Sequence, residues 1–282
     1  MKILAAVDRS PESHMALRYV CHLLEHFDAE VEALYVKPDV LHIVLEDFDV
    51  PFLKRKDPGE KAEAEAREVE QEIVNACEVC LGGKVPCEPK TVVGEPADQI
   101  LSAAHEGDYD LIVLGSHGRS FLQGLLLGAL HSKILHHARR PVLIAREVRQ
   151  IHRVLVAYRG SSCDQSALRF IAPLLSRKRP EITVLHVQET ALGESDGFAQ
   201  ACLLQGQRTL SELGHAPVTK GVEGDFVDET LREITTGDYD LVVLGAYGYA
   251  RPKYLRAISD EAITVVSRTV RPVLVYREKA QG

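Results

Sequence analysis

The chain has 282 residues, a length that predicts two domains at roughly 150 residues per domain. Its formal net charge is −8, with 26% charged and 45% hydrophobic residues. This balance is typical of a soluble globular chain and argues against a general nucleic-acid binder, which needs a basic face. No apolar run approaches the roughly 18 residues of a membrane span, so we expect no membrane contact. Six cysteines do not indicate a disulfide scaffold, and a cytoplasmic location is therefore expected.

The first half of the chain alternates strand-like and helix-like segments. Residues 3–7 form a short β-rich run that predicts a strand, and the apolar spacing of residues 11–27 predicts an amphipathic helix. The other predicted elements are a strand at 31–36, a helix at 58–81, a strand at 84–93, a helix at 96–105, a strand at 111–114, a helix at 128–138 and a strand at 142–145. Strands joined by helical crossovers form a parallel sheet covered on both faces, which is an α/β fold.

A second copy of this design follows the first. The nine residues 107–115 return as residues 237–245 with a single Ile-to-Val difference, and the start and end of each copy also repeat. We place the two domains at residues 1–147 and 152–282. The sequence thus predicts two tandem doubly wound, Rossmann-like domains, each with a five-stranded, mainly parallel sheet.

Three residues at the carboxyl ends of predicted strands point to a ligand site in the first domain. In doubly wound sheets, ligands bind beyond the carboxyl ends of the strands, at a topological switch point. Asp8, Val36 and Gly115 end three of the strands. We therefore expect these three residues to converge on one crevice.

The segment after the fourth strand has features of an anion site. Gly115 and Gly118 leave backbone N–H groups uncovered and permit positive φ, and Gly128 opens a helix whose N-terminus favours negative charge. His117 and Arg119 add hydrogen-bonding and charged groups for a phosphate. Glycines after a strand also occur in simple turns, and their spacing alone does not decide between the two interpretations.

These motifs resemble the universal stress protein (UspA-like) family in its tandem two-domain form, over nearly the whole chain. The family's nucleotide signature is Gly, two residues, Gly, nine residues, Gly, then Ser or Thr. The sequence matches it with Gly115, Gly118 and Gly128, but Ala129 stands where the family prefers a hydroxyl. The resemblance also implies that the last strands of the two domains pair, so that one chain forms an intrachain pseudo-dimer. Whether two such chains form a homodimer is left undecided by the sequence.

The resemblance implies that the first domain binds ATP or a related adenine nucleotide, with Mg²⁺ as an optional companion. Asp8 would then approach the adenosine part, and Val36 would contact the adenine through its backbone. The implied phosphate contacts are Leu114, Gly115, His117, Gly118, Arg119, Gly128, Ala129 and Leu130. The missing hydroxyl at position 129 would weaken binding without abolishing it, because its backbone N–H remains.

The second copy departs further from the family pattern. Arg159 replaces Asp8, and Ile258 or Ser259 stands where the third glycine would be. We therefore predict a degenerate second site and about one nucleotide per chain. A second possibility is that Arg159 and Arg251 hold a different anion.

The resulting function is a nucleotide-dependent binding or signalling module in a stress response, acting on an unknown protein partner. No catalytic residue or metal site is predicted, because no triad order, ligand cluster or Walker lysine stands out. The alternatives are a slow ATPase or nucleotidyl-transfer enzyme, and a structural adaptor with a vestigial site. We also expect nucleotide to order the loop at 116–127, although its leucines could order it by packing alone.

Four further features have competing interpretations. Cys77, Cys80 and Cys87 suggest a metal or redox site, but the first two continue an apolar helix stripe and are better explained as packed thiols. We interpret His131, His136 and His137 as surface histidines. The acidic stretch 57–72 is expected to be a solvated helix face, and the apolar segment 41–52 a packed insertion or a lid.

Overall fold

The computed structural model describes residues 1–25, 27–37, 58–116, 127–247 and 259–277, with side chains of the third helix described from residue 67 onward. The strands are β1 (Lys2–Val7), β2 (Glu30–Lys37), β3 (Cys87–Val93), β4 (Leu111–Gly115), β5 (Val142–Ala145), β6 (Arg153–Ala157), β7 (Glu181–Gln188), β8 (Val218–Glu223), β9 (Leu241–Gly245) and β10 (Val273–Tyr276). The helices are α1 (Pro11–Leu23), α3 (Pro58–Leu81), α4 (Pro96–Glu106), α5 (Ala129–His137), α6 (Ser162–Leu175), α7 (Asp196–Glu212), α8 (Phe226–Gly237) and α9 (Asp260–Arg268), with a short 3₁₀ helix at Thr190–Leu192.

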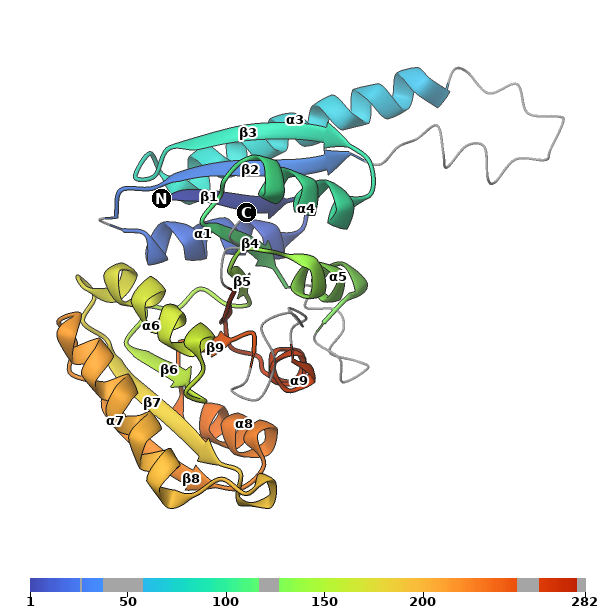
Figure 1. The fold of residues 1–282 in the computed structure, drawn as a ribbon. Helices are drawn as coiled ribbons and strands as arrows, with labels where there is room; N and C mark the ends of the chain where they lie inside the picture. The colour runs from blue at the N-terminus through green and yellow to red at the C-terminus, as the bar shows by residue number, and fades with distance from the viewer. Residues whose placement is uncertain (26, 38–57, 117–126, 248–258, 278–282) are drawn as a thin grey trace, which may run out of the picture.

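The ten strands form one continuous sheet in the order β3-β2-β1-β4-β5-β10-β9-β6-β7-β8. Each half contributes five parallel strands, and the halves meet where β5 pairs with β10 in antiparallel orientation (Figure 1). In this pairing Leu143 faces Leu274, and both are buried. The prediction of two tandem doubly wound domains joined through their last strands is confirmed, and the pairing covers two apolar edges that would otherwise be exposed.

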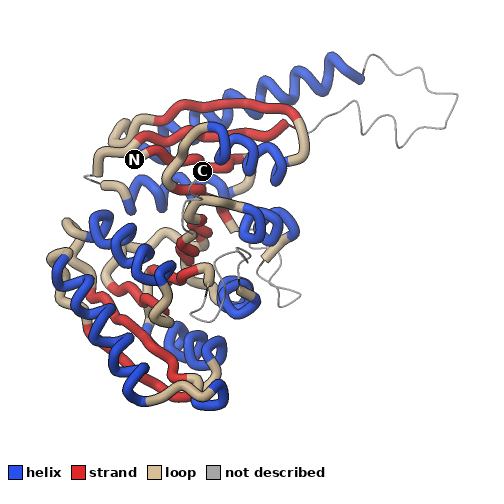
Figure 2. Tube along the Cα trace, in the orientation of Figure 1, coloured by secondary structure: helices blue, strands red, loops and turns tan. Residues whose placement is uncertain are grey.

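Helices cover both faces of the sheet, as the tube in Figure 2 shows. On one face, α1, α3, α6 and α7 pack against the strands in one hydrophobic core, and on the other face α4, α5, α8 and α9 form a second core. Both cores run through the two halves, because the sheet is continuous across β5 and β10. Since both faces are buried, the central strands are uniformly apolar, as in β4, where the four residues 111–114 are all buried.

The first helix is shorter than its apolar pattern predicted. The expected helix at 11–27 ends at Leu23, and Leu24 forms its C-cap with an N–H bond to the Val20 carbonyl. Phe27 lies beyond the helix and is only partly buried, although it still packs against the core. Phe27 therefore packs against the core from the turn that follows the helix, although its spacing in the sequence is helical.

The strand predicted from Lys84 begins three residues later, at Cys87. Gly82 and Gly83 adopt positive φ values of 55° and 67°, and Lys84 donates its N–H to the Leu81 carbonyl. A tight turn thus occupies the residues that were assigned to the strand, and only after it does the chain reach the sheet.

The junction of the two halves lies in the segment 146–152, between the end of β5 and the start of β6. Among the described helices, none combines the length and apolar composition that crossing a bilayer requires.

Candidate functional site

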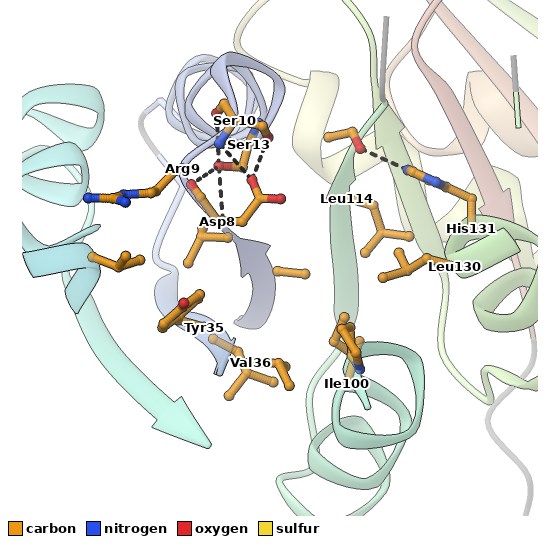
Figure 3. Close-up of a pocket in the computed structure, with 16 residues that line it drawn as sticks. Asp8, Arg9, Ser10, Ser13, Tyr35, Val36, Ile100, Leu114, Leu130 and His131 are labelled. Atoms are coloured by element: carbon orange, nitrogen blue, oxygen red, sulfur yellow. Dashed lines mark hydrogen bonds between the residues drawn. The ribbon is translucent and has the colours of Figure 1, made fainter. Parts of the chain in front are cut away.

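A cavity of about 560 Å³ lies at the carboxyl ends of β1, β2 and β4 (Figure 3). This volume falls within the range of small-molecule sites. Its lining combines an apolar wall with a polar end, and consists of Ala6, Val7, Asp8, Arg9, Ser10, Ser13, Leu34, Tyr35, Val36, Val69, Pro96, Ile100, Leu114, Gly115, Leu130 and His131. Asp8, Val36 and Gly115 therefore meet at one cavity, as their positions at strand ends predicted.

Asp8 is held in place by the turn that follows β1. Its carboxylate oxygen Oδ1 accepts hydrogen bonds from the Ser10 backbone N–H, at 2.9 Å, and from the Ser10 hydroxyl. Ser13, on the first turn of α1, accepts the Asp8 N–H at 3.1 Å and donates its hydroxyl to the Asp8 carbonyl at 2.7 Å. No contact within the described residues engages Oδ2, so this oxygen is available to a ligand.

Gly115 permits the end of β4 to lie against the start of α1. A Cβ atom there would lie 2.3 Å from the Glu12 carbonyl oxygen and 2.9 Å from the Ser13 nitrogen, which are backbone atoms that cannot move aside. Gly115 is not among the residues with positive φ. Gly115 thus does not use the positive φ that a glycine permits, and close packing explains the glycine instead.

His131 closes the cavity on the side of α5. Its ring Nε2 lies 2.8 Å from the Gly115 carbonyl oxygen, and the side chain is 2% exposed. The prediction of a surface histidine is wrong here, because the third residue of α5 faces the end of β4. His136 and His137, at the other end of the helix, are exposed as predicted.

The N-terminus of α5 differs from the other α-helix N-termini whose capping is described. Gly128 is its N-cap and supplies no side-chain hydrogen bond, and the first turn contains no acidic residue. The N-caps of α1, α4, α6, α7, α8 and α9 all accept a backbone N–H through a side-chain oxygen. The first N–H groups of a helix lack intrahelical partners and carry partial positive charge, so the end of α5 beside the cavity favours negative charge.

The remaining wall is apolar, with one charged side chain at its rim. Val36, Ile100 and Leu114 are buried core residues whose surfaces face the cavity. Partial burial raises the pKa of Tyr35, so its phenol stays neutral. Arg9 points away toward α3 in Figure 3, where its Nε lies 2.7 Å from Glu72. The described part of the acidic stretch therefore includes an ion pair as well as solvated carboxylates.

The predicted site residues fall into three groups. Asp8, Val36, Leu114, Gly115 and Leu130 line the cavity. Gly128 and Ala129 form the N-cap and first residue of α5. His117, Gly118 and Arg119 lie outside the described residues, as do Arg251, Ile258, the apolar segment 41–52 and most of the loop 116–127.

Sequence reasoning missed several lining residues, chiefly Ser10, Ser13, Tyr35 and Ile100. Ser10 could have been found, because a serine before Pro11 is a helix-start signal directly after the first strand. Ile100 carried no signal of its own, since its position on a helical stripe predicts core packing as readily as a cavity wall.

In the second half, the matching crevice is occupied by the protein's own arginine. Arg159 stands at the position equivalent to Asp8, and its Nη2 donates to the Gly245 carbonyl at 2.8 Å. Its Nη1 lies 3.4 Å from the Ser259 hydroxyl, and its guanidinium stacks on the Phe226 ring at 4.6 Å. This side chain therefore spans the crevice from β6 to β9, α9 and α8.

Two further features of the second crevice disfavour an anion. The N-terminus of α9 is capped by the Ser259 hydroxyl, and its first turn carries Asp260 and Glu261. Asp164 occupies the position equivalent to Ser13 and uses Oδ2 to accept the N–H groups of Arg159 and Ser161. Burial raises the pKa of this carboxyl group.

Cys77 and Cys80 are buried on the inner face of α3, as the packing interpretation predicted. Within the described parts of the chain, no three His, Cys, Asp or Glu side chains are placed to hold a metal ion.

Comparison with known families agrees with this architecture. The sequence profile of the Universal stress protein family matches residues 1–146 and again residues 150–277. The chain belongs to the universal stress protein family. Its two matches correspond to the two halves of the sheet, so this is a tandem member of the family.

Individual relatives match mainly one half at a time. The chain is 30% identical to universal stress protein Slr1230 of Synechocystis over 176 residues, covering 61% of this chain and 59% of that protein. It is 31% identical to universal stress protein YxiE of Bacillus subtilis over 145 residues, covering 51% of this chain and 98% of that protein. A universal stress protein structure from Archaeoglobus fulgidus aligns with a TM-score of 0.74 at 21% identity, covering 98% of both chains, which supports the tandem fold.

Proposed function

We propose that this universal stress protein binds ATP or a related adenine nucleotide in the cavity of its first half, and that it acts as a nucleotide-dependent binding module in a stress response. The observation that carries the proposal is the combination, within one cavity, of an apolar wall, the Asp8 carboxylate and the uncapped N-terminus of α5. An adenine nucleotide has the matching parts: a flat aromatic base, hydroxyl donors on the ribose, and an anionic phosphate chain.

Each part of the nucleotide has a matching region. The base would lie against Val36 and Ile100, where burial of apolar surface favours binding. The ribose hydroxyls would donate to Asp8, whose Oδ2 is available. The phosphates would accept N–H groups from the first turn of α5, together with the loop residues His117, Gly118 and Arg119. Mg²⁺ would bind through the phosphates, as it usually does in such sites, with Asp8 as the nearby carboxylate.

We further propose one nucleotide per chain. The described part of the second crevice contains Arg159, a capped helix and two first-turn carboxylates, so it offers a phosphate chain a cation already engaged and no uncapped helix N-terminus. The cytoplasm is the proposed compartment, since all six cysteines are free thiols.

The first experiment identifies any small molecule released when the purified protein is denatured, by mass spectrometry. The second experiment uses calorimetry to measure the binding of ATP to the wild type and to two variants with tryptophan at matching positions of α5 and α9. Leu130→Trp places a large ring in the cavity, whereas Glu261→Trp places it at the matching position of α9. We expect a stoichiometry near one, lost in the first variant and kept in the second. Two equivalent sites, or equal loss in both variants, would contradict the proposal.

The same preparation distinguishes the alternative functions. Release of phosphate from ATP that is abolished by Asp8→Asn would indicate a slow ATPase. Absence of binding at millimolar ATP, in protein from which no nucleotide was released on denaturation, would indicate an adaptor with a vestigial site.

A further inference from the structure

Two cysteine side chains meet where α3 passes over the outer edge of the sheet. Cys77 lies on the inner face of α3, in the same buried stripe as Val69 and Ile73, and is 3% exposed. Cys87 is the first residue of β3 and is partly exposed. Among the described strands, β3 is the edge of the sheet and is paired on one side only, with β2.

The sheet register directs Cys87 toward the helix. Cys87 pairs with Val31 of β2, and neighbours in register on parallel strands project from the same face. Val31 belongs to the core beneath α1 and α3, and Cys87 packs against that core. Its side chain therefore projects toward the helix that carries Cys77.

The turn between α3 and β3 returns the chain alongside the end of α3, against which β3 packs. Cys77 lies one turn before Leu81, the last residue of α3, and the two are about 6 Å apart along the helix axis. Gly82 and Gly83, both with positive φ, then reverse the chain into β3. The two thiols lie close enough for each to shift the pKa of the other. Such proximity is the first condition that a disulfide requires.

We propose that Cys77 and Cys87 form a redox-active pair that is converted to a disulfide by a two-electron oxidant of the peroxide class. The Cys77–Cys87 bond would tie the C-terminal part of α3 to the edge strand. The same helix contributes Val69 to the cavity wall and Glu72 to the Arg9 ion pair. Oxidation would therefore restrain the helix that forms one side of the cavity.

The chemistry requires one equivalent of peroxide. The neighbouring Cys87 thiol lowers the pKa of Cys77, while the pKa of Cys87 is raised, so Cys77 is the more acidic thiol and is the one assigned to attack. Its sulfur bonds to one peroxide oxygen, the O–O bond breaks, and water leaves to give a sulfenic acid. The Cys87 sulfur then displaces hydroxide, which leaves as a second water. In sum, two thiols and one H₂O₂ give one disulfide and two waters.

The test counts thiols before and after oxidation. The full chain is treated with a small excess of H₂O₂, its remaining thiols are alkylated, and the product is weighed intact. We expect four alkylated cysteines where the untreated protein has six, with recovery to six after dithiothreitol. Trypsin cleaves after Lys84, which lies between the two cysteines, so the disulfide should keep residues 68–84 and 85–90 joined in an unreduced digest.

Two variants assign the pair. Cys87→Ser should abolish the linkage and leave Cys77 as a sulfenic acid that dimedone labels. Cys80→Ser should keep the linkage, although Cys80 lies on the same helix face. Circular dichroism checks that both variants fold. The proposal is overturned if all six thiols survive while a cysteine peptide in the same tube is oxidised, or if the bond joins other cysteines such as Cys21 and Cys80.

Discussion

Arg146 and Arg277 cross the boundary between the two halves in opposite directions, and each binds the C-terminal end of the other half's last helix. Arg146, after β5, donates to the carbonyls of Val266 and Thr269 at the end of α9. Arg277, after β10, donates to the carbonyls of His136 and Ala138 at the end of α5. These carbonyls lack intrahelical donors and carry partial negative charge, so the two cations satisfy them. The contact made by Arg277 also links α5 to the second half, and the other end of this helix borders the cavity.

Replacing Arg277 by alanine should reduce the free energy of unfolding by about 1–3 kcal/mol, because its removal leaves buried carbonyls without a donor. Arg277 is 2% exposed, so water cannot easily replace it. The measurement is urea denaturation followed by circular dichroism. Arg232→Ala is the control, since the Arg232 side chain is 69% exposed where it pairs with Glu229 and its loss should change stability by less than about 0.5 kcal/mol. Equal effects of the two substitutions would refute a specific role for Arg277.

Introducing the hydroxyl that the family signature prefers should strengthen nucleotide binding. In Ala129→Ser, the new hydroxyl lies on the first residue of α5 and can donate to a phosphate. A hydrogen bond to a charged group contributes about 1.5–3 kcal/mol, which corresponds to about tenfold or more in Kd for ATP. Calorimetry gives the affinity. Asp260→Ser, at the equivalent position of α9, should produce no new site, and an unchanged Kd in Ala129→Ser would argue against phosphate at this helix end.

Removing Arg159 should destabilise the second half without creating a second nucleotide site. Arg159→Ala leaves the Gly245 carbonyl without its donor, with an expected loss of about 1–3 kcal/mol. The capped and acidic first turn of α9 remains, so ATP should still bind with a stoichiometry near one. Denaturation and calorimetry measure the two effects. A stoichiometry of two would mean that Arg159 alone excludes nucleotide from the second crevice.

Asp164 should make stability fall as pH rises. Burial raises its pKa in the folded state, so the folded protein holds this proton more tightly than the unfolded chain. The contribution of Asp164 to the free energy of unfolding is complete below its pKa of about 4 in the unfolded chain. It is lost as pH rises through its pKa in the folded protein. The stability difference between wild type and Asp164→Asn should therefore decrease from pH 4 to pH 7.

Asp238 supplies a control of opposite sign for this pH dependence. The hydrogen bond from Arg149 lowers its pKa, so its contribution is present above the unfolded pKa and is lost as pH falls. Urea midpoints of Asp164→Asn and Asp238→Asn, measured across a pH series that is extended well below the unfolded pKa of about 4, should diverge in opposite directions from the wild type. The same trend in both variants would show that burial of Asp164 does not set its pKa.

Nucleotide should protect residues 116–130 from hydrogen exchange. The first N–H groups of α5 have no side-chain cap, and bound phosphate would give them acceptors. Exchange is compared with and without saturating ATP, and residues 259–262 at the start of α9 serve as the internal reference. Equal protection in both states would mean that the segment is ordered by its own packing, and the site would hold nucleotide without switching.

Local sequence was sufficient to predict most of the secondary structure. Apolar runs gave the strands, and the repeated nine residues ending at Gly115 and Gly245 gave two domains of one design, because both signals depend on residues close together in the chain. Where prediction failed, a turn was the cause. The apolar pattern of the first helix continued past its end at Leu23, and that of the third strand began before its start at Cys87. At both places, hydrophobic residues in turns also pack against the core.

The convergence of Asp8, Val36 and Gly115 was also predictable, because the rule that ligands bind at strand ends needs only the order of elements. The sequence by itself therefore determined the fold class, the duplication and the general position of the cavity.

The tertiary structure decided what each side chain contacts. Arg159 was visible in the sequence as a replaced aspartate, but only the folded chain shows its guanidinium on the Gly245 carbonyl, 86 residues away along the sequence. The burial of His131 depends on α5 packing against the end of β4, and the exchange of Arg146 and Arg277 between halves depends on β5 pairing with β10. Such contacts join residues distant in sequence, whose approach is set by packing of the whole sheet and leaves no periodic signal in the local pattern of hydrophobic residues.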